Sequence, residues 1–312
     1  MNDWTDATVR GIRIAAIVAS LGVGLNVAAA HAGGSFQPIS SPLDLFAAPA
    51  PRSAAPNAPS VDCGATPAGF SAWLEGFKRD VEVAGMPPAV IESALANASY
   101  NPDVIAHDRR QGSFGQDFET FAAKRVTGPR VRKGRQMLIA YAEPLETIER
   151  RFGVPGPVLV AIWGLETEFG AGLGNYPTFS TLATLAYDCR RSEQFREELA
   201  DALQLVARGY LQPQEMRGAW AGELGQTQFM PSTYLKYAVG ANGGSIADLM
   251  NSPEDALAST ANFLRSKGWR RGQGYHEGEA NYAALLQWNA APVYAKTIAY
   301  FADRLAGDAE PQ

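Results

Sequence analysis

Two carboxylates stand in the most apolar stretch of the sequence, where charge is costly to bury. The run Val158–Phe169 predicts a buried helix, and it contains Glu166 and Glu168. Two residues apart on a helix, their side chains point about 200° away from each other. The predicted face of Glu166 carries four apolar or aromatic residues, Leu159, Ile162, Trp163 and Phe169, whereas Glu168 lies nearer the helix edge.

Such surroundings suit Glu166 to acid catalysis. An apolar and aromatic environment disfavours a carboxylate and raises its pKa. A carboxyl group that stays protonated near neutral pH can act as the general acid in glycosidic cleavage. The residues alone leave a second interpretation equally open, in which Glu166 caps a neighbouring helix or pairs with an arginine.

A second stretch, Arg217–Tyr237, combines glycines, neutral amides and aromatic residues. Three glycines within eight residues allow close approach of the backbone, and Gln226, Thr227 and Gln228 precede Phe229 and Met230. Amides beside apolar and aromatic side chains suit sugars, whose hydroxyl groups need donors and acceptors and whose ring faces stack. In the simpler interpretation Phe229 and Met230 belong to the core. The Pro-Ser pair after Met230 predicts a helix start in either case.

Composition excludes several other chemistries. The chain has 27 Lys and Arg against 32 Asp and Glu, a net charge of −5, so we expect no nucleic-acid partner. Its three histidines are His31, His107 and His276, and it has only two cysteines. Closely spaced zinc ligands are therefore missing, and we expect no metal site. A Cys/His or Ser/His nucleophile would have to use His107, and no neighbouring residue suggests that.

The N-terminus predicts export. Arg10 and Arg13 precede the apolar stretch Ile14–Ala30, and small residues follow, so residues 1–32 are expected to be a cleavable signal peptide that directs the chain to the periplasm. An uncleaved anchor is the alternative. Residues 33–68, rich in Pro, Ala and Ser, predict a disordered linker. The residues before Cys63 lack the pattern of a lipidation site.

The two cysteines, Cys63 and Cys189, are expected to form a disulfide, because an oxidising compartment favours the pairing of two lone cysteines. The bridge would join the start of the folded region to its middle. Two buried free thiols are the alternative.

The remaining chain has the periodicity of helices, and residues 69–307 predict one mostly α domain. Apolar residues recur at helical spacing from Phe70 to Phe77, from Val90 to Leu95 and from Met137 to Phe152. Further predicted helices are Ser180–Tyr187, Ser192–Ala207, Pro253–Lys267, Ala280–Trp288 and Pro292–Leu305.

Four ordered motifs, AIWGLETEFG, ATLAYDCRR, GAWAGELGQTQFMPSTY and ANFLRSKGW, resemble those of the lytic murein transglycosylase B family. The resemblance runs from about Phe70 to Leu305. It implies a lysozyme-like α domain with additional flanking helices. The implied enzyme is a peptidoglycan lytic transglycosylase that cleaves the MurNAc–GlcNAc β-1,4 bond of glycan strands. Cell-wall synthesis or secretion-machinery proteins are the candidate protein partners, and we expect a monomer.

Site residues follow from the resemblance, position by position. The glutamate of the family's G-[hydrophobic]-E-[ST] motif falls on Glu166, which makes it the single catalytic acid and base. The substrate-binding residues implied are Arg190, Arg191, Gln228, Met230, Trp288, Asn289 and Tyr294. Arg190 and Arg191 could hold peptide or lactyl carboxylates; alternatively they bind neighbouring Glu193 or Glu197.

The implied mechanism uses one carboxyl group twice. Glu166 protonates the leaving oxygen and then takes the proton of the muramic C6 hydroxyl, which gives a 1,6-anhydro end without a metal or organic cofactor. A hydrolytic muramidase and a non-catalytic peptidoglycan-binding or scaffolding protein are the alternatives.

Two departures from the family stand out. Ala219 replaces a serine that assists the catalytic glutamate, so Glu223 or a backbone group would have to substitute. The calcium loop of the family corresponds to Gly240–Ser245, followed only by Asp248, so we expect weak calcium binding or none.

Overall fold

A computed structural model describes residues 63–110, 117–244 and 246–307. They form a mostly α fold, as expected, with one two-stranded sheet. The helices are α1 Phe70–Val83, α2 Pro88–Leu95, α3 Pro102–Arg109, α4 Phe118–Arg125, α5 Gly128–Ala140, α6 Ala142–Phe152, α7 Gly156–Thr167, α8 Thr178–Tyr187, α9 Ser192–Ala207, α10 Pro231–Tyr237, α11 Pro253–Ser266, α12 Tyr282–Trp288 and α13 Pro292–Ala306. A 3₁₀ turn, Pro67–Gly69, precedes α1.

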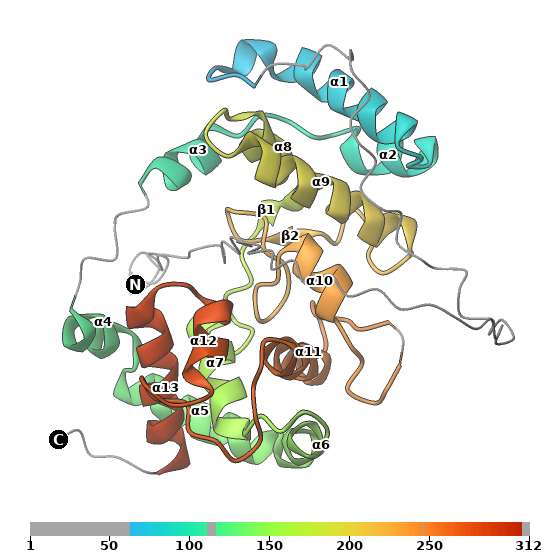
Figure 1. Ribbon diagram of the computed structural model, residues 1–312. Helices are drawn as coiled ribbons and strands as arrows, with labels where there is room; N and C mark the ends of the chain where they lie inside the picture. The colour runs from blue at the N-terminus through green and yellow to red at the C-terminus, as the bar shows by residue number, and fades with distance from the viewer. Residues whose placement is uncertain (1–62, 111–116, 245, 308–312) are drawn as a thin grey trace, which may run out of the picture. The chain divides into compact units, whose positions relative to one another are not determined.

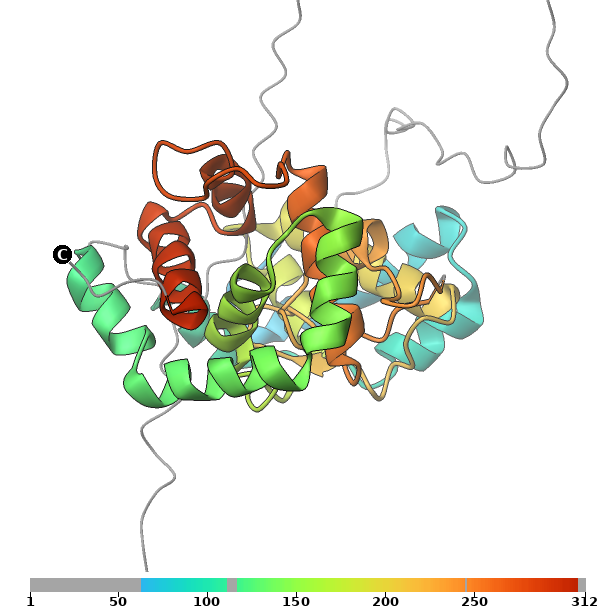
Figure 2. The same cartoon turned by 90° about the horizontal axis from the view of Figure 1, so that it is seen from below.

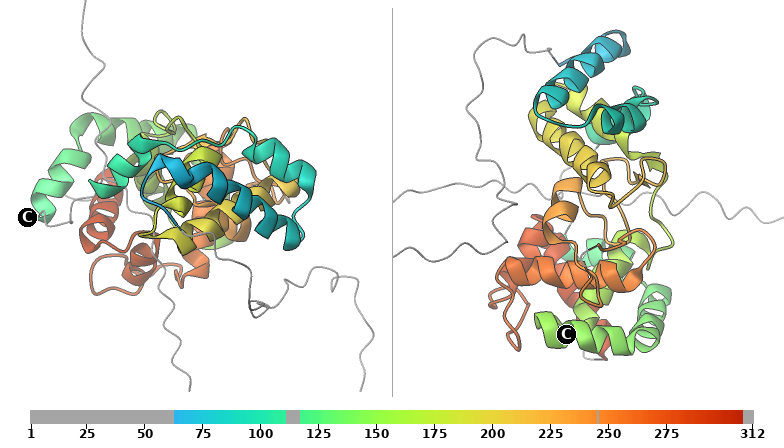
Figure 3. Two further views of the ribbon diagram at one scale, coloured as in Figure 1. Left: turned by 90° about the horizontal axis from the view of Figure 1, so that it is seen from above. Right: turned by 90° about the vertical axis from the view of Figure 1, so that its right-hand side faces the viewer.

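Within Asp62–Gln312 the helices pack in two groups, which Figures 1 and 3 separate clearly. In one group α8 packs against α1, α2, α3 and α9. In the other α7 is the centre, in contact with α5, α6, α11 and α13. Figure 2 shows α4 and α5 running along one side of this second group, with α13 beside them. Helix α7 is apolar all round and its middle is fully buried, which is the arrangement its sequence predicts.

Two connections join the groups. Helix α10 packs against both α9 and α11. The sheet pairs β1, Tyr176–Pro177, with β2, Arg217–Gly218, in antiparallel register, and β1 follows the loop that leaves α7. The last turn of α7 and the segment between β2 and α10 are therefore brought together at the junction of the two groups (Figure 1).

Helix ends follow local chemistry. Proline occupies the first turn of several helices, and Gly153 ends α6 in the left-handed conformation at φ 78°. The side chains of Asp117 and Thr127 accept backbone N–H groups at the starts of α4 and α5. Val126 and Thr127 are both non-helical, and the Thr127 cap begins α5 anew, so α4 and α5 are separate helices although Arg125 and Gly128 lie close in sequence.

Two helix predictions need correction. Helix α7 ends at Thr167, not at Phe169, because Glu168 and Phe169 both adopt positive φ, at 54° and 60°. Glu168 therefore does not lie on the helix, and Phe169 does not extend the face of Glu166. The run from Met137 to Phe152 is also broken, because Tyr141 ends α5 and the chain turns into α6.

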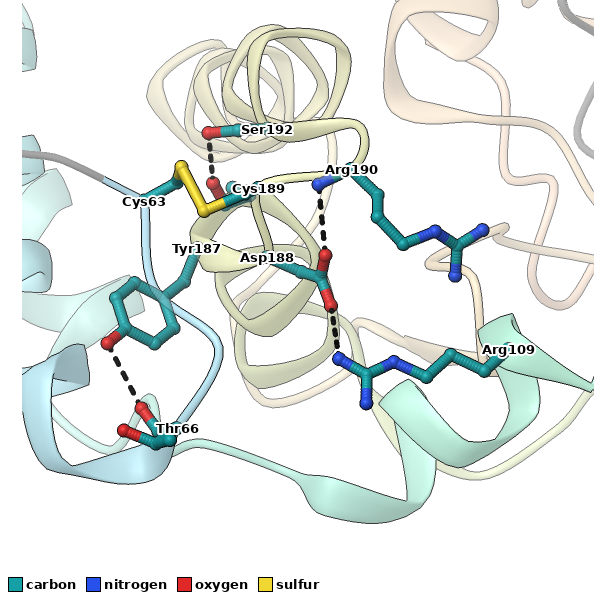
Figure 4. The surroundings of a disulfide bond; sticks show 9 residues. Cys63, Thr66, Arg109, Tyr187, Asp188, Cys189, Arg190 and Ser192 are labelled. Atoms are coloured by element: carbon teal, nitrogen blue, oxygen red, sulfur yellow. Dashed lines mark hydrogen bonds and ion pairs between the residues drawn. A yellow bond between two sulfur atoms is a disulfide. The ribbon is translucent and has the colours of Figure 1, made fainter.

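A disulfide joins Cys63 to Cys189, with Cα atoms 4.9 Å apart (Figure 4). This is the pair expected from the sequence. Next to it, Gly64 N–H donates to Tyr187 O at 2.9 Å, and the Tyr187 hydroxyl donates to Thr66 O at 3.0 Å. The entry to the first helix is thereby fixed to the end of α8. The predicted signal peptide, and the linker except for residues 63–68, lie outside the described residues.

Among the residues that the structure describes, no helix is both long enough and apolar enough to cross a bilayer.

Candidate active site

Glu166 lies in the last turn of α7 and receives two hydrogen bonds on one oxygen. Trp288 Nε1 donates to Glu166 Oε1 at 3.0 Å, and the Tyr294 hydroxyl donates to the same atom at 2.8 Å. The donors come from α12 and from the first turn of α13. The structure thus brings Trp288 and Tyr294, two predicted site residues, onto Glu166, which lies more than a hundred positions before them in sequence. It also places Trp288 and Tyr294 on the carboxyl group itself, whereas the resemblance implies only that they face the glycan.

Aromatic packing holds the two donors in place. The Trp288 ring lies 5.6 Å from the ring of Phe229 and 5.3 Å from that of Phe263, measured between centroids. The Tyr294 ring makes an edge contact with Phe121 at 6.3 Å. Because Trp288 and Tyr294 are buried, their polar atoms need partners, and the Glu166 carboxyl group supplies them.

Gln226 ties the end of α7 to the segment before α10. Its Oε1 accepts from Trp163 Nε1 at 3.1 Å, and its backbone oxygen accepts from the Thr167 hydroxyl at 2.5 Å. Gly170, at φ 84°, passes so close that a Cβ atom there would stand 2.7 Å from Gln226 Oε1. A glycine is therefore required at this position. Gln226 is one of the amides whose sequence context suits sugars, but its side chain is buried against α7.

Gln228 and Met230 complete this segment. Gln228 adopts a left-handed conformation at φ 58°, and its Nε2 donates to Gly225 O at 2.7 Å and Leu173 O at 3.3 Å. Met230 is the N-cap residue of α10, and Pro231 begins the helix, as predicted. A non-glycine residue held at positive φ next to a candidate site indicates a backbone that the surrounding contacts fix.

Glu198 anchors this helix from α9, and the sequence analysis did not single it out. Its carboxylate accepts from Ser232 N at 3.0 Å and from the Ser232 hydroxyl at 2.7 Å, at the start of α10. The side chain is buried, and burial raises its pKa from 4.5 to about 7 against the effect of the Ser232 bonds. A glutamate on the apolar face of α9, at i+3 from Phe195, is the signal that could have revealed it.

The pKa of Glu198 predicts a pH-dependent stability. Between pH 4.5 and about 7 the unfolded chain has released a proton that the folded protein keeps, so stability falls as pH rises through this window. Glu198→Gln cannot ionise, and it should be more stable than the native protein at pH 8 by up to about 3 kcal/mol, with little difference at pH 4.5. Urea unfolding of both proteins at the two pH values measures this. An equal difference at both values would contradict it.

Arg190 and Arg191 are bound to Asp108 of α3. Arg190 Nη1 donates to Asp108 Oδ2 at 2.6 Å, and Arg191 Nη2 donates to the other oxygen. The alternative pairing with Glu193 or Glu197 is therefore wrong. The side chain of Asp108 is 2% exposed, whereas that of Arg190 is 49% exposed. One buried carboxylate thus orients two guanidinium groups, and Arg190 keeps half of its surface available.

A second ion pair extends this cluster. Arg109 Nη2 lies 3.5 Å from Asp188 Oδ2, and Asp188 Oδ1 accepts from the backbone N of Arg190 at 3.0 Å (Figure 4). Two acidic and three basic side chains therefore meet beside the disulfide, which leaves a net positive charge. The acidic members, Asp108 and Asp188, were missed because nothing in the sequence brings α3 next to α8.

The second carboxylate, Glu168, and the predicted site residue Asn289 have other partners. Glu168 is exposed and forms an ion pair with Arg130. Asn289 is buried, and its Oδ1 accepts at 3.0 Å from the backbone N of Ala291, the N-cap residue of α13. Neither arrangement resembles that of Glu166.

Known proteins share sequence and fold with this chain. Residues 69–278 match the model of the transglycosylase SLT domain. Over 153 residues the chain is 34% identical to membrane-bound lytic murein transglycosylase B of Escherichia coli (strain K12); the match covers 49% of this chain and 42% of that protein. The chain therefore spans less than half of that curated relative.

Solved structures extend the likeness. SltB3 from Pseudomonas aeruginosa, in complex with NAG-anhNAM-pentapeptide, has a TM-score of 0.72 at 28% identity, over 77% of this chain and 80% of that chain. Escherichia coli lytic transglycosylase Slt35, in complex with calcium, has the same fold, with a TM-score of 0.67 at 23% identity. The match covers 75% of this chain and 92% of that chain.

The chain belongs to the transglycosylase SLT domain family, since the family model matches more than half of its length. The resemblance to lytic murein transglycosylase B and the lysozyme-like, mostly α fold are both confirmed.

Proposed function

We propose that this protein is a peptidoglycan lytic transglycosylase of the cell envelope, which cleaves the MurNAc–GlcNAc β-1,4 bond and leaves 1,6-anhydromuramoyl ends. The observation that carries the proposal is the environment of Glu166, one carboxyl group at the end of a buried helix with two neutral donors on a single oxygen. The family membership and the bound NAG-anhNAM-pentapeptide of the solved SltB3 support the substrate class.

The two bonds to Glu166 distinguish its oxygens. A carboxyl oxygen has two in-plane lone pairs, and Trp288 and Tyr294 each donate to Oε1. In its acid form this carboxyl group would protonate the leaving glycosidic oxygen. Both of these donors are neutral groups, and a residue that serves twice must be able to give up a proton and to take one back.

The steps balance without water. Glu166 gives its proton to the glycosidic oxygen as the bond to the muramic anomeric carbon breaks. The acetamido group of that sugar stabilises the positive charge, and the C6 hydroxyl then attacks the anomeric carbon and returns a proton to Glu166. Most glycosidases use a second carboxylate instead. The nearest one in sequence, Glu168, is exposed and bound to Arg130, which favours the single-residue mechanism.

The arginine cluster is suited to the acidic parts of the substrate. Arg190 and Arg109 have side chains about half exposed, at 49% and 54%, and both are oriented by buried aspartates. Peptide or lactyl carboxylates would bind such guanidinium groups by paired hydrogen bonds. Gln228 and Met230, in the segment between β2 and α10, are the proposed sugar contacts.

A non-catalytic scaffold is the competing function, and Ala219 in place of serine favours it. Incubation of purified sacculi with the protein separates the two. An enzyme releases soluble muropeptides with time, and a scaffold sediments with the sacculi and releases nothing. Sedimentation without release, at enzyme-to-substrate ratios that digest sacculi with a known lytic transglycosylase, would contradict our proposal.

Tyr294→Phe tests the role of the donors. The substitution keeps the ring that packs on Phe121 and removes one hydrogen bond to Glu166, a group that carries charge during the cycle. We therefore expect kcat to fall by about 10- to 100-fold, with a smaller change in KM. Tyr300→Phe, on the same helix and bonded to Arg304, is the control and should keep native rates. Equal rates for the two variants would exclude Tyr294 from the mechanism.

A further inference from the structure

Three polar side chains on one face of α11 bind the backbone of the segment that follows α10. Asn262 Nδ2 donates to Tyr237 O at 2.9 Å. Ser259 accepts from Val239 N at 2.9 Å and donates to Val239 O at 3.2 Å. Asp255 Oδ1 accepts from Ala241 N at 2.8 Å. We call these three residues the α11 ladder.

The spacing of the ladder explains its fit. Four residues of helix rise about 6 Å, and two residues of extended chain advance about 6.6 Å. This match holds for Asp255 and Ser259, which bind Ala241 and Val239; Asn262 lies only three residues beyond Ser259, a rise of about 4.5 Å, and binds Tyr237 O at the end of α10. The ladder fixes this segment against α11 although it forms no strand.

Asp255 also closes the loop that follows. Its second oxygen, Oδ2, accepts from Asp248 N at 2.9 Å, so one carboxylate joins the two ends of the loop Ala241–Asp248. The Asp248 carboxylate is itself occupied, because its Oδ1 accepts from the backbone N of Met250 at 3.0 Å and of Asn251 at 2.9 Å.

The closed loop reaches the candidate active site. Leu249 O, one residue beyond the loop, accepts from Gln226 N at 2.9 Å, and Gln226 binds Trp163 and Thr167 of α7. Tyr234 holds the same end, because its hydroxyl donates to Ala247 O at 2.6 Å. A shift of this loop would therefore move the Gln226–Met230 segment relative to the helix that carries Glu166.

The described residues of this loop, 241–244 and 246–248, do not suit calcium, which the solved Slt35 holds. Calcium requires six to eight oxygen ligands, several of them charged. Here both oxygens of Asp255 accept backbone N–H groups, and those of Asp248 are engaged within its own turn. Across residues 63–110, 117–244 and 246–307, no cluster of three His, Cys, Asp or Glu side chains could hold a metal ion.

We propose that Asp255 takes the place of a cation in this loop and is a positioning residue for the Gln226–Met230 segment. A carboxylate accepts backbone N–H groups where a cation would instead bind carbonyl and carboxylate oxygens. The loop is thereby closed by the chain itself, without a dissociable ion. The link to substrate rests on the proposed function, whereas the closure of the loop does not.

The test compares Asp255→Asn with Glu254→Gln. Both remove one negative charge from the first turn of α11, so they change the helix-dipole interaction alike, but only Asp255 bridges the loop. An asparagine keeps one acceptor oxygen and turns an NH₂ group toward the other backbone N–H. Asp255→Asn should lower the Tm by about 3–8 °C, and Glu254→Gln by about 1 °C or less.

Kinetics on sacculi, measured well below both Tm values, separate positioning from general stability. A displaced binding segment raises KM at least fivefold and changes kcat by less than threefold. A purely structural loss lowers the active fraction and leaves KM unchanged, and that result would overturn the positioning role. The Tm readout does not depend on activity, so failure of the proposed function is distinguishable from failure of this inference.

Calcium titration of the native protein completes the test. We expect no heat of binding at millimolar calcium and no change in Tm with calcium or a chelator. A Tm rise of several degrees with calcium would show that a cation closes the loop, and would overturn the proposal. If Asp255→Asn does not fold, Ser259→Ala removes the neighbouring contact and should raise KM in the same direction. An unchanged KM in that variant would also contradict the proposal.

Discussion

Glu166→Gln should abolish the release of muropeptides from sacculi and leave the fold intact. The substitution keeps the volume of the side chain and the acceptor for Trp288 and Tyr294, and removes only the ability to give and take a proton. General acid and base catalysis contributes about 10²- to 10⁴-fold to a rate. Because one group performs both transfers here, the loss should reach the top of that range or exceed it.

Glu168→Gln is the matched control for this variant. It makes the same chemical change two residues away, on an exposed side chain whose partner is Arg130. We expect near-native activity and a Tm within a few degrees of native, since exposed ion pairs contribute about 0–1 kcal/mol. Release of muropeptides by Glu166→Gln within tenfold of the native rate would refute the assignment of the catalytic residue.

Reduction of the Cys63–Cys189 disulfide should cause the largest loss of stability. The bridge spans 126 residues of sequence, and chain-entropy models give about 4–5 kcal/mol for a loop of this size, as an upper value. It also fixes the start of the folded region beside Arg190 (Figure 4). Substrate affinity should therefore weaken under reducing conditions before the chemistry at Glu166 is affected.

Two measurements check the disulfide prediction. Urea unfolding with and without reductant gives the loss of stability, and a Cys63→Ser, Cys189→Ser variant should show the reduced value under both conditions. Thiol titration of the unfolded, unreduced protein should find no free thiol. Two free thiols per chain would mean that the protein carries no bridge.

Glu166 could be singled out from the sequence because burial of charge is local information. A glutamate in an apolar helix is anomalous whatever the rest of the fold, and the resemblance of the surrounding motifs then implied the catalytic role that we propose for it. The C-terminal helices could be predicted equally well, because their hydrophobic periodicity is strong and proline marks the start of α11 and of α13.

The residues that support the site could not be predicted in the same way. Asp108 and Glu198 act on residues more than thirty positions away, so their roles depend on how helices pack. The left-handed conformation of Glu168 ended α7 early although glutamate favours helices, because tertiary contacts outweigh intrinsic propensity. Likewise, Trp288 and Tyr294 donate to Glu166 from helices far along the chain, which the sequence did not indicate. Support for Glu166 from Glu223 or a backbone group stays a prediction.

The mass of the soluble products from purified sacculi tests the central claim most directly. If Glu166 transfers a proton from the C6 hydroxyl, the muramic end is a 1,6-anhydro sugar, and each product is lighter by one water than the corresponding hydrolysis product. We expect anhydromuropeptides with the native protein and none with Glu166→Gln. Products that carry a free reducing end, and so have gained one water, would contradict the claim and identify a hydrolytic muramidase.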